Sequence, residues 1–146
     1  MPKVISIPKN FKRFSASNKF TLLMLQGFTF GVYNTRLKLK NDCYKFRQSE
    51  IVTVLVVGEL TQCKVTEFAN VLGYKNSVAR SVLNRAEKRK IIYREGGRKG
   101  RGNCAKYYLT GMGYKIYQTL QSELSKTFEQ AKNELTRNIL IKLNRY

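Results

Sequence analysis

The segment at residues 91–110, IIYREGGRKGRGNCAKYYLT, constrains the fold more than any other stretch of the chain. Two runs rich in β-branched and aromatic residues, 91–94 and 106–110, flank a loop that contains four glycines, which predicts a β-hairpin. A cationic, glycine-rich tip is suited to a phosphate backbone or a minor groove rather than to a protein core. Only one acid, Glu95, accompanies its basic residues. These are Arg94, Arg98, Lys99, Arg101 and Lys106.

Two segments of helical periodicity precede this hairpin. Apolar residues recur at helical spacing over 65–72 and again over about 76–90, and Gly73 between them suits a tight, left-handed turn. Two short helices with a glycine at their junction, followed by a hairpin, predict a winged helix-turn-helix. The second helix is expected to bury one face and to expose a basic one. The residues expected to point inward are Val78, Ala79, Val82, Leu83 and Ala86.

This architecture predicts where DNA would be contacted. The start of the second helix of such a pair reaches base edges in the major groove, and Arg80 is the first candidate because arginine can pair with guanine O6 and N7. We expect Arg85 and Lys88 to meet phosphates. The hairpin would enter a narrow A·T minor groove or bind phosphate without sequence preference, and the sequence leaves both open. The recognition-helix contacts predicted are Lys75, Asn76, Ser77, Arg80, Ser81, Asn84, Arg85 and Lys88.

The charge of the chain supports a polyanionic partner. Its 146 residues carry a formal net charge of +19, and residues 75–106 hold eleven Lys and Arg against two acids. The chain contains no histidine and a single aspartate, Asp42, so we expect no enzyme activity, no metal site and no cofactor. No run of 18 apolar residues exists, and the N-terminus lacks a secretory signal, so we expect a cytoplasmic, nucleoid-associated protein without membrane contact.

The rest of the chain divides into helical segments around the DNA-binding part. We expect a basic N-terminal arm at 1–17, a helical dimerisation segment at 18–44, the winged helix-turn-helix at 45–111 and a C-terminal dimerisation helix at 112–146. Within 45–111, Ser49 is expected to cap a helix over 50–60. The apolar stripe of the last helix is long enough to seek a partner helix. The predicted dimer-interface residues are Phe20, Leu23, Leu120, Leu124, Phe128, Leu135 and Ile139.

The order of these elements resembles the MarR family of winged-helix transcription regulators. The resemblance covers about residues 45–125 and rests on three runs: FRQSEIVTVLVVGEL, KVTEFANVLGYKNSVARSVLNRAEKRKIIYRE and YYLTGMGYKIYQTLQSEL. It implies a mainly α fold with a small β-hairpin wing (α+β), and a homodimer joined by its N- and C-terminal helices on a roughly palindromic operator. The chain departs from the family at the wing tip, where Arg101 and Asn103 stand near the positions of an Asp-x-Arg motif.

Three functional readings follow. The leading one is a dimeric, sequence-specific regulator of transcription, expected to act as a repressor; the alternative is an architectural or replication-associated protein that coats nucleic acid with little specificity. A cationic membrane-surface protein is a weaker option. The sequence gives no support for a small-molecule effector, although Tyr107, Tyr108, Tyr114 and Tyr117 could line a cavity. A redox switch at Cys43 or Cys104 is conceivable, but ordinary free thiols explain both.

Overall fold

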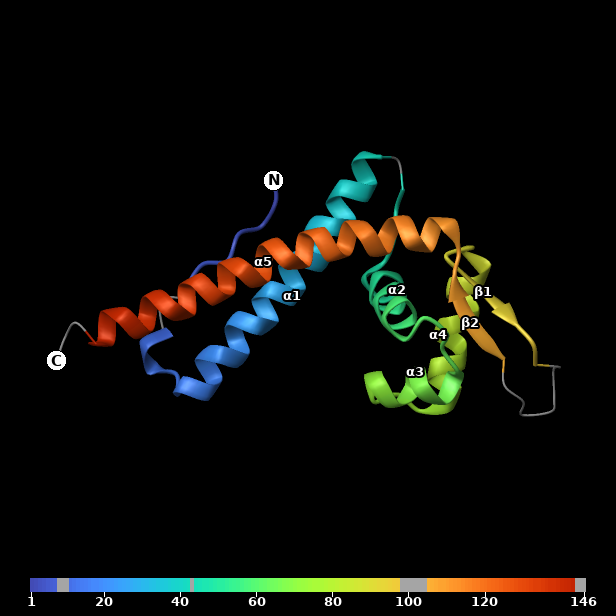
Figure 1. The fold of residues 1–146 in the computed structure, drawn as a ribbon, viewed down its shortest axis with the longest axis horizontal. Coiled ribbons are helices and arrows are strands. Elements are labelled where there is room, and N and C mark those ends of the chain that lie inside the picture. The colour runs from blue at the N-terminus through green and yellow to red at the C-terminus, as the bar shows by residue number, and fades with distance from the viewer. Residues whose placement is uncertain (8–10, 43, 98–104, 144–146) are drawn as a thin grey trace. The chain divides into compact units, whose positions relative to one another are not determined.

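The computed structural model describes residues 1–7, 11–42, 44–97 and 105–143. Its chain forms two compact units, one from residues 1–44 together with 120–146 and one from residues 45–119 (Figure 1). The elements in order are η1 (Phe11–Arg13), α1 (Ala16–Asn41), α2 (Gln48–Leu60), α3 (Val65–Leu72), α4 (Asn76–Lys88), β1 (Ile92–Glu95), β2 (Lys106–Leu109) and α5 (Gly111–Leu143). The predicted mainly α fold with one antiparallel hairpin is therefore confirmed.

The first unit is built on the pairing of α1 with the later turns of α5. Its apolar cluster joins Leu23 of α1 and Ala131 of α5 with Ile5 and Phe11, all at most 6% exposed. The N-terminal segment thus contributes side chains to this core. Helix α1 begins at Ala16 rather than at residue 18, because Ser15 caps it by accepting the Asn18 N–H at 3.3 Å.

Two glycines let α1 and α5 approach closely. A Cβ atom on Gly27 would lie 2.9 Å from the Phe128 ring, and one on Gly31 would lie 2.6 Å from Leu124 Cδ2. Because the helices lie so close, the Thr127 hydroxyl can donate a hydrogen bond to the Gly27 carbonyl at 2.6 Å. Glycine is unfavourable inside a helix when considered locally, and its value here comes from a contact about a hundred residues away.

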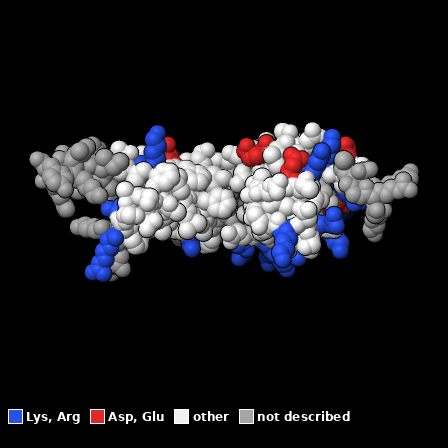
Figure 2. Space-filling view, turned by 90° about the horizontal axis from the view of Figure 1, so that it is seen from below, with Lys and Arg blue, Asp and Glu red and all other residues white. Residues whose placement is uncertain are grey.

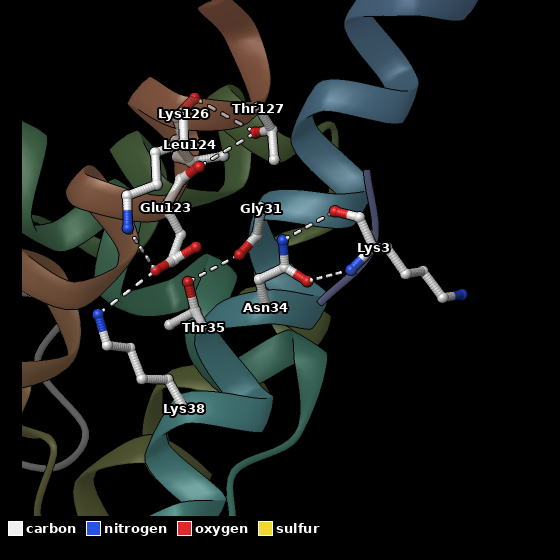
Figure 3. A network of polar contacts seen from close by, with 9 residues as sticks. All are labelled: Lys3, Gly31, Asn34, Thr35, Lys38, Glu123, Leu124, Lys126 and Thr127. Carbon is white, nitrogen blue, oxygen red and sulfur yellow. Dashed lines mark hydrogen bonds and ion pairs between the residues drawn. The ribbon is translucent and has the colours of Figure 1, made fainter. Parts of the chain in front are cut away.

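Polar side chains fasten the same unit, as Figure 3 shows. The Asn34 side chain accepts the Lys3 N–H at 2.8 Å and donates to the Lys3 carbonyl at 3.1 Å. Gln130 accepts the Ile5 N–H at 3.1 Å. On α5, the buried carboxylate of Glu123 lies 3.5 Å from Lys38 Nζ and 3.4 Å from Lys126 Nζ. Asn34 and Gln130 thus attach the first residues of the chain to both helices, and Glu123 links α5 to α1.

The second unit packs α3, α4 and the hairpin around α2. Helix α2 buries Ile51, Thr53, Val54, Val56 and Val57, which accounts for the apolar density of this segment. The predicted cap at Ser49 is wrong: α2 starts at Gln48 with Arg47 as its N-cap, and the Glu50 carboxylate accepts the Arg47 N–H at 3.1 Å. Gly58 lets the Tyr117 ring of the same unit pack against α2, because a Cβ atom at this position would clash with that ring.

Candidate nucleic-acid interface

The turn between α3 and α4 is set by Gly73. Its φ of 70° lies in the left-handed region, which residues with a Cβ disfavour, and no atom lies within 4 Å of where a Cβ would sit. The following N–H, that of Tyr74, donates to the Ala69 carbonyl at 2.9 Å. Helix α3 therefore stops at Leu72, and the chain enters α4 after Lys75.

Helix α4 has one buried face and one exposed face. Ala79, Leu83 and Ala86 are at most 1% exposed and pack inward, whereas Val82 and Glu87 at the edge are half-buried. The helix contains no acid in its first turn and ends with Arg85 and Lys88 in its last turn. All eight predicted contact residues of this helix are exposed: Lys75, Asn76, Ser77, Arg80, Ser81, Asn84, Arg85 and Lys88.

One prediction for this helix is wrong. Val78 was expected to point inward, but 45% of its surface is exposed. It precedes Ala79 by one position, so it lies about 100° round the helix axis from the centre of the buried stripe. The valine stands instead beside the polar residues of the exposed face.

An ion pair holds the C-terminal end of α4 against α2. Arg89 Nε lies 3.1 Å from Glu50 Oε2, and the guanidinium also donates to the Lys45 carbonyl. Its carbon lies 5.5 Å from the centre of the Phe46 ring, which adds a cation–π contact. Sequence reasoning did not single out Arg89, because its partner carboxylate is 39 residues away.

The hairpin carries the predicted wing. Strands β1 and β2 pair with Ile92 opposite Leu109 and Glu95 opposite Lys106. Cys63 extends this ladder, since it exchanges two backbone hydrogen bonds of 3.0 and 2.8 Å with Tyr107. Of the predicted wing contacts, Arg94 is exposed and Lys106 is half-buried. Arg98, Lys99 and Arg101 lie outside the described residues.

Charged residues of α4 and β1 both lie near Tyr107. Burial, followed by the charge of Glu87, raises the pKa of the Tyr107 phenol, while the charges of Arg94 and Arg80 oppose this rise. Arg80 of α4 and Arg94 of β1 therefore act on the same buried phenol. In Figure 2, several blue side chains project along the lower edge of the right-hand half of the view, whereas the upper edge of that half carries red side chains together with a blue one.

The cysteine and tyrosine side chains have mixed surroundings. Burial raises the pKa of the Cys63 thiol to about 11, which keeps it protonated at neutral pH. Cys43 and Cys104 lie outside the described residues. Tyr107 is buried, Tyr108 and Tyr117 are half-buried and Tyr114 is exposed. Among the described residues, no three potential metal ligands cluster together.

The predicted dimer-interface residues fall into two groups. Phe20 is 51% exposed, whereas Leu23, Leu120 and Leu124 are buried within a single protomer. Phe128 and Leu135 are half-buried, and the side chain of Ile139 lies outside the described residues. No described helix combines the length and apolar character needed to cross a bilayer.

Comparison with known proteins rests on structure alone. No family model and no curated protein sequence matches the chain. The oxidized form of MarR from E. coli is similar, with a TM-score of 0.61, 14% identity and coverage of 89% of this chain and 87% of that one.

Structures of MepR from Staphylococcus aureus match as well. MepR, a transcription regulator of the multidrug efflux pump MepA, gives a TM-score of 0.55 at 19% identity, covering 90% of this chain and 93% of that one. A MepR variant bound to an oligodeoxyribonucleotide gives a TM-score of 0.55 at 17% identity, covering 90% and 97%. These identities are low, and the likeness concerns the fold. From its element order, its hairpin and these matches, the chain has a MarR-like winged-helix fold.

Proposed function

We propose that the protein is a sequence-specific, double-stranded DNA-binding regulator of transcription, and that it acts as a homodimeric repressor. The observation that carries this proposal is the exposed face of α4. It offers arginine, asparagine and serine side chains on the second helix of a helix-turn-helix, with a cationic hairpin after it. These side chains can form hydrogen bonds with base edges in the major groove. The pattern of donors and acceptors there differs among all four base pairs, so such contacts can specify a sequence.

The roles of individual residues follow from their places on the helix and the hairpin. Ser77, Arg80, Ser81 and Asn84 lie in the first two and a half turns, the part of a recognition helix that enters the groove. Arg85 and Lys88 lie near its C-terminal end and would bind phosphates. The wing residues would bind the backbone or the minor groove, adding affinity that depends on salt.

The first experiment compares a specific and a random duplex by fluorescence anisotropy. The DNA upstream of the protein's own gene and a shuffled duplex are titrated at low and near-physiological salt. A preference of about 10³-fold or more for the native fragment at the higher salt supports a specific regulator. If the native fragment and the shuffled duplex bind equally well, the protein is used to select its preferred duplexes from a random-sequence library. A selection that enriches no sequence would replace the proposal with the second candidate below.

Variants then test the division of labour. Arg80→Ala is expected to lower the preference for the selected duplex over a shuffled one. Lys99→Ala is expected to weaken all duplexes alike and to flatten the salt dependence by about one unit. Equal losses on specific and random DNA for both variants would contradict these roles.

The homodimer is best tested by a point variant. Truncation at Ser122 would remove Leu124, Thr127 and Ala131, which pack within the protomer itself, so it would unfold the first unit whatever the oligomeric state. Phe20→Glu changes an exposed apolar side chain of α1 instead. We expect sedimentation equilibrium to show a dimer for the wild type and weakened association for this variant, with Val71→Glu on α3 as a control of similar exposure.

A second candidate function is a low-specificity coat on nucleic acid. The net charge of +19 favours it, because phosphate contacts alone give strong binding that falls steeply with salt. Equal affinities for native, shuffled and selected duplexes, all lost as salt rises, would support this candidate.

A further inference from the structure

The exposed valine of the recognition helix has no role in the contacts described so far. Val78 is 45% exposed, although its neighbour Ala79 is fully buried. It lies in the first turn of α4, at the third helical position after Lys75. The apolar stripe that faces the core on this helix is made by Ala79 and Leu83, which are fully buried, so Val78 lies outside it.

The surroundings of Val78 narrow down what it could contact. Residues three, four and seven positions apart share a helix face, which places Ser81, Val82 and Arg85 on the side of Val78. Val82 is half-buried, while Ser81 and Arg85 are exposed, so the valine lies at the border between the core and the polar face. Arg80 is exposed and lies two positions after Val78, about 200° round the helix axis, so it stands on the opposite flank. The exposed face of α4 is therefore polar in its middle, with an arginine on one edge and an apolar side chain on the other.

In the major groove, every base pair presents hydrogen-bonding groups, and an A·T pair also presents one apolar group. The C5-methyl group of thymine is an apolar knob on the groove surface, and it is read by apolar contact. A valine can bury such a methyl group but can neither donate nor accept a hydrogen bond. We propose that Val78 reads the 5-methyl group of a pyrimidine in the major groove. This inference rests on the proposed function and names the chemical feature recognised on one flank of its recognition helix.

The proposed contact also limits which bases the bound DNA would contain. A 5-methylcytosine carries its methyl group at the same ring position as thymine, so the contact does not by itself distinguish the two. Arg80, on the other flank, would read guanine through O6 and N7. The favoured half-site therefore combines a thymine or methylated cytosine with a guanine.

The test uses the full-length protein and DNA that differs only in methyl groups. A duplex is first selected from a random-sequence library with the wild-type protein. It is then made again with each thymine in turn replaced by deoxyuridine, which removes one methyl group and leaves the base pairing intact. We expect at least one replacement to weaken wild-type binding about fourfold, the factor that corresponds to one buried carbon. Restoring the group as 5-methylcytosine opposite guanine at that position should bind more tightly than unmethylated cytosine there.

Variants connect this loss to the valine. Val78→Ala is expected to bind the thymine duplex about as weakly as the wild type binds the deoxyuridine duplex, and to be indifferent to the replacement. Alanine has a higher helix propensity than valine, and the site is exposed, so the variant should fold; circular dichroism checks this. Val71→Ala is the matched control, because Val71 is a valine of 58% exposure on α3. It should keep the wild-type sensitivity to deoxyuridine.

The outcomes separate this inference from the proposed function. A selected sequence in which no thymine methyl group affects binding would overturn the role of Val78 while leaving sequence-specific binding in place. A methyl-dependent loss that persists in Val78→Ala would also overturn it. A selection that enriches no sequence would overturn the proposed function and this inference with it.

Discussion

Replacing Gly31 by alanine would test the close approach of α1 and α5. The new methyl group would lie 2.6 Å from Leu124 Cδ2, 3.1 Å from Thr127 Oγ1 and 3.3 Å from Leu124 Cα. The first contact can be relieved by rotating a side chain, but the third involves backbone. Inserting a methyl group into a packed core costs about 1–3 kcal/mol, and the higher helix propensity of alanine returns about 1 kcal/mol. We expect a net loss of up to about 2 kcal/mol in the free energy of unfolding.

Urea unfolding followed by circular dichroism at a fixed protein concentration measures this loss. Gly111→Ala is the control, because no atom lies within 4 Å of where its Cβ would sit, and its stability should stay within about 0.5 kcal/mol of the wild type. A double-mutant cycle with Leu124→Ala locates the cause, since removing Cδ2 should make Gly31→Ala less costly by about 1 kcal/mol. A stabilising Gly31→Ala, or additive effects in the cycle, would refute the argument.

Further predictions concern the unit formed by residues 45–119. Arg89→Met should lower the free energy of unfolding by about 1–2 kcal/mol, because it leaves the buried Glu50 carboxylate without its ion pair; the half-exposed guanidinium keeps the effect below that of a fully buried pair. Arg89→Lys, which keeps the charge, should recover part of this loss in the same urea assay, and equal losses would contradict the ion-pair explanation. In a Cys43→Ser, Cys104→Ser background, Cys63 should react with a thiol reagent at pH 8 at least tenfold more slowly than in urea, since its pKa is about 11. Because folding raises this pKa above 9.0, the contribution of the thiol to stability is present below pH 9 and is lost as pH rises toward 11. A pH dependence that is unchanged in Cys63→Ala would contradict this.

The strongly periodic elements could be predicted from the sequence. The segment over 65–90 has short-range signals that agree with one another: Gly73 at the turn, apolar residues at helical spacing and a basic outer face. The hairpin strands also lie within one residue of their predicted positions, since β-prone residues flank the glycine-rich loop.

Features that depend on distant partners could not be predicted. Gly27 and Gly31 weaken a helix when read locally, and only the Phe128 and Leu124 side chains of α5 explain them. Ile5 and Phe11 looked like part of a basic arm, because nothing nearby in the sequence indicates that Asn34 and Gln130 hold that segment. The exposure of Val78, by contrast, could have been found by counting helical positions from Ala79.

The division of the chain into units has a consequence for its synthesis. Residues 45–119 are contiguous, whereas the other unit joins residues 1–44 to residues 120–146. During translation, α1 therefore leaves the ribosome long before the α5 segment that covers Leu23 and fills the space beside Gly31. The unit of residues 45–119 does not need the later turns of α5 for its core, whereas the apolar side chains of α1 stay uncovered until those turns are made. A nascent chain arrested before residue 120 should thus be a better substrate for chaperones than the finished protein.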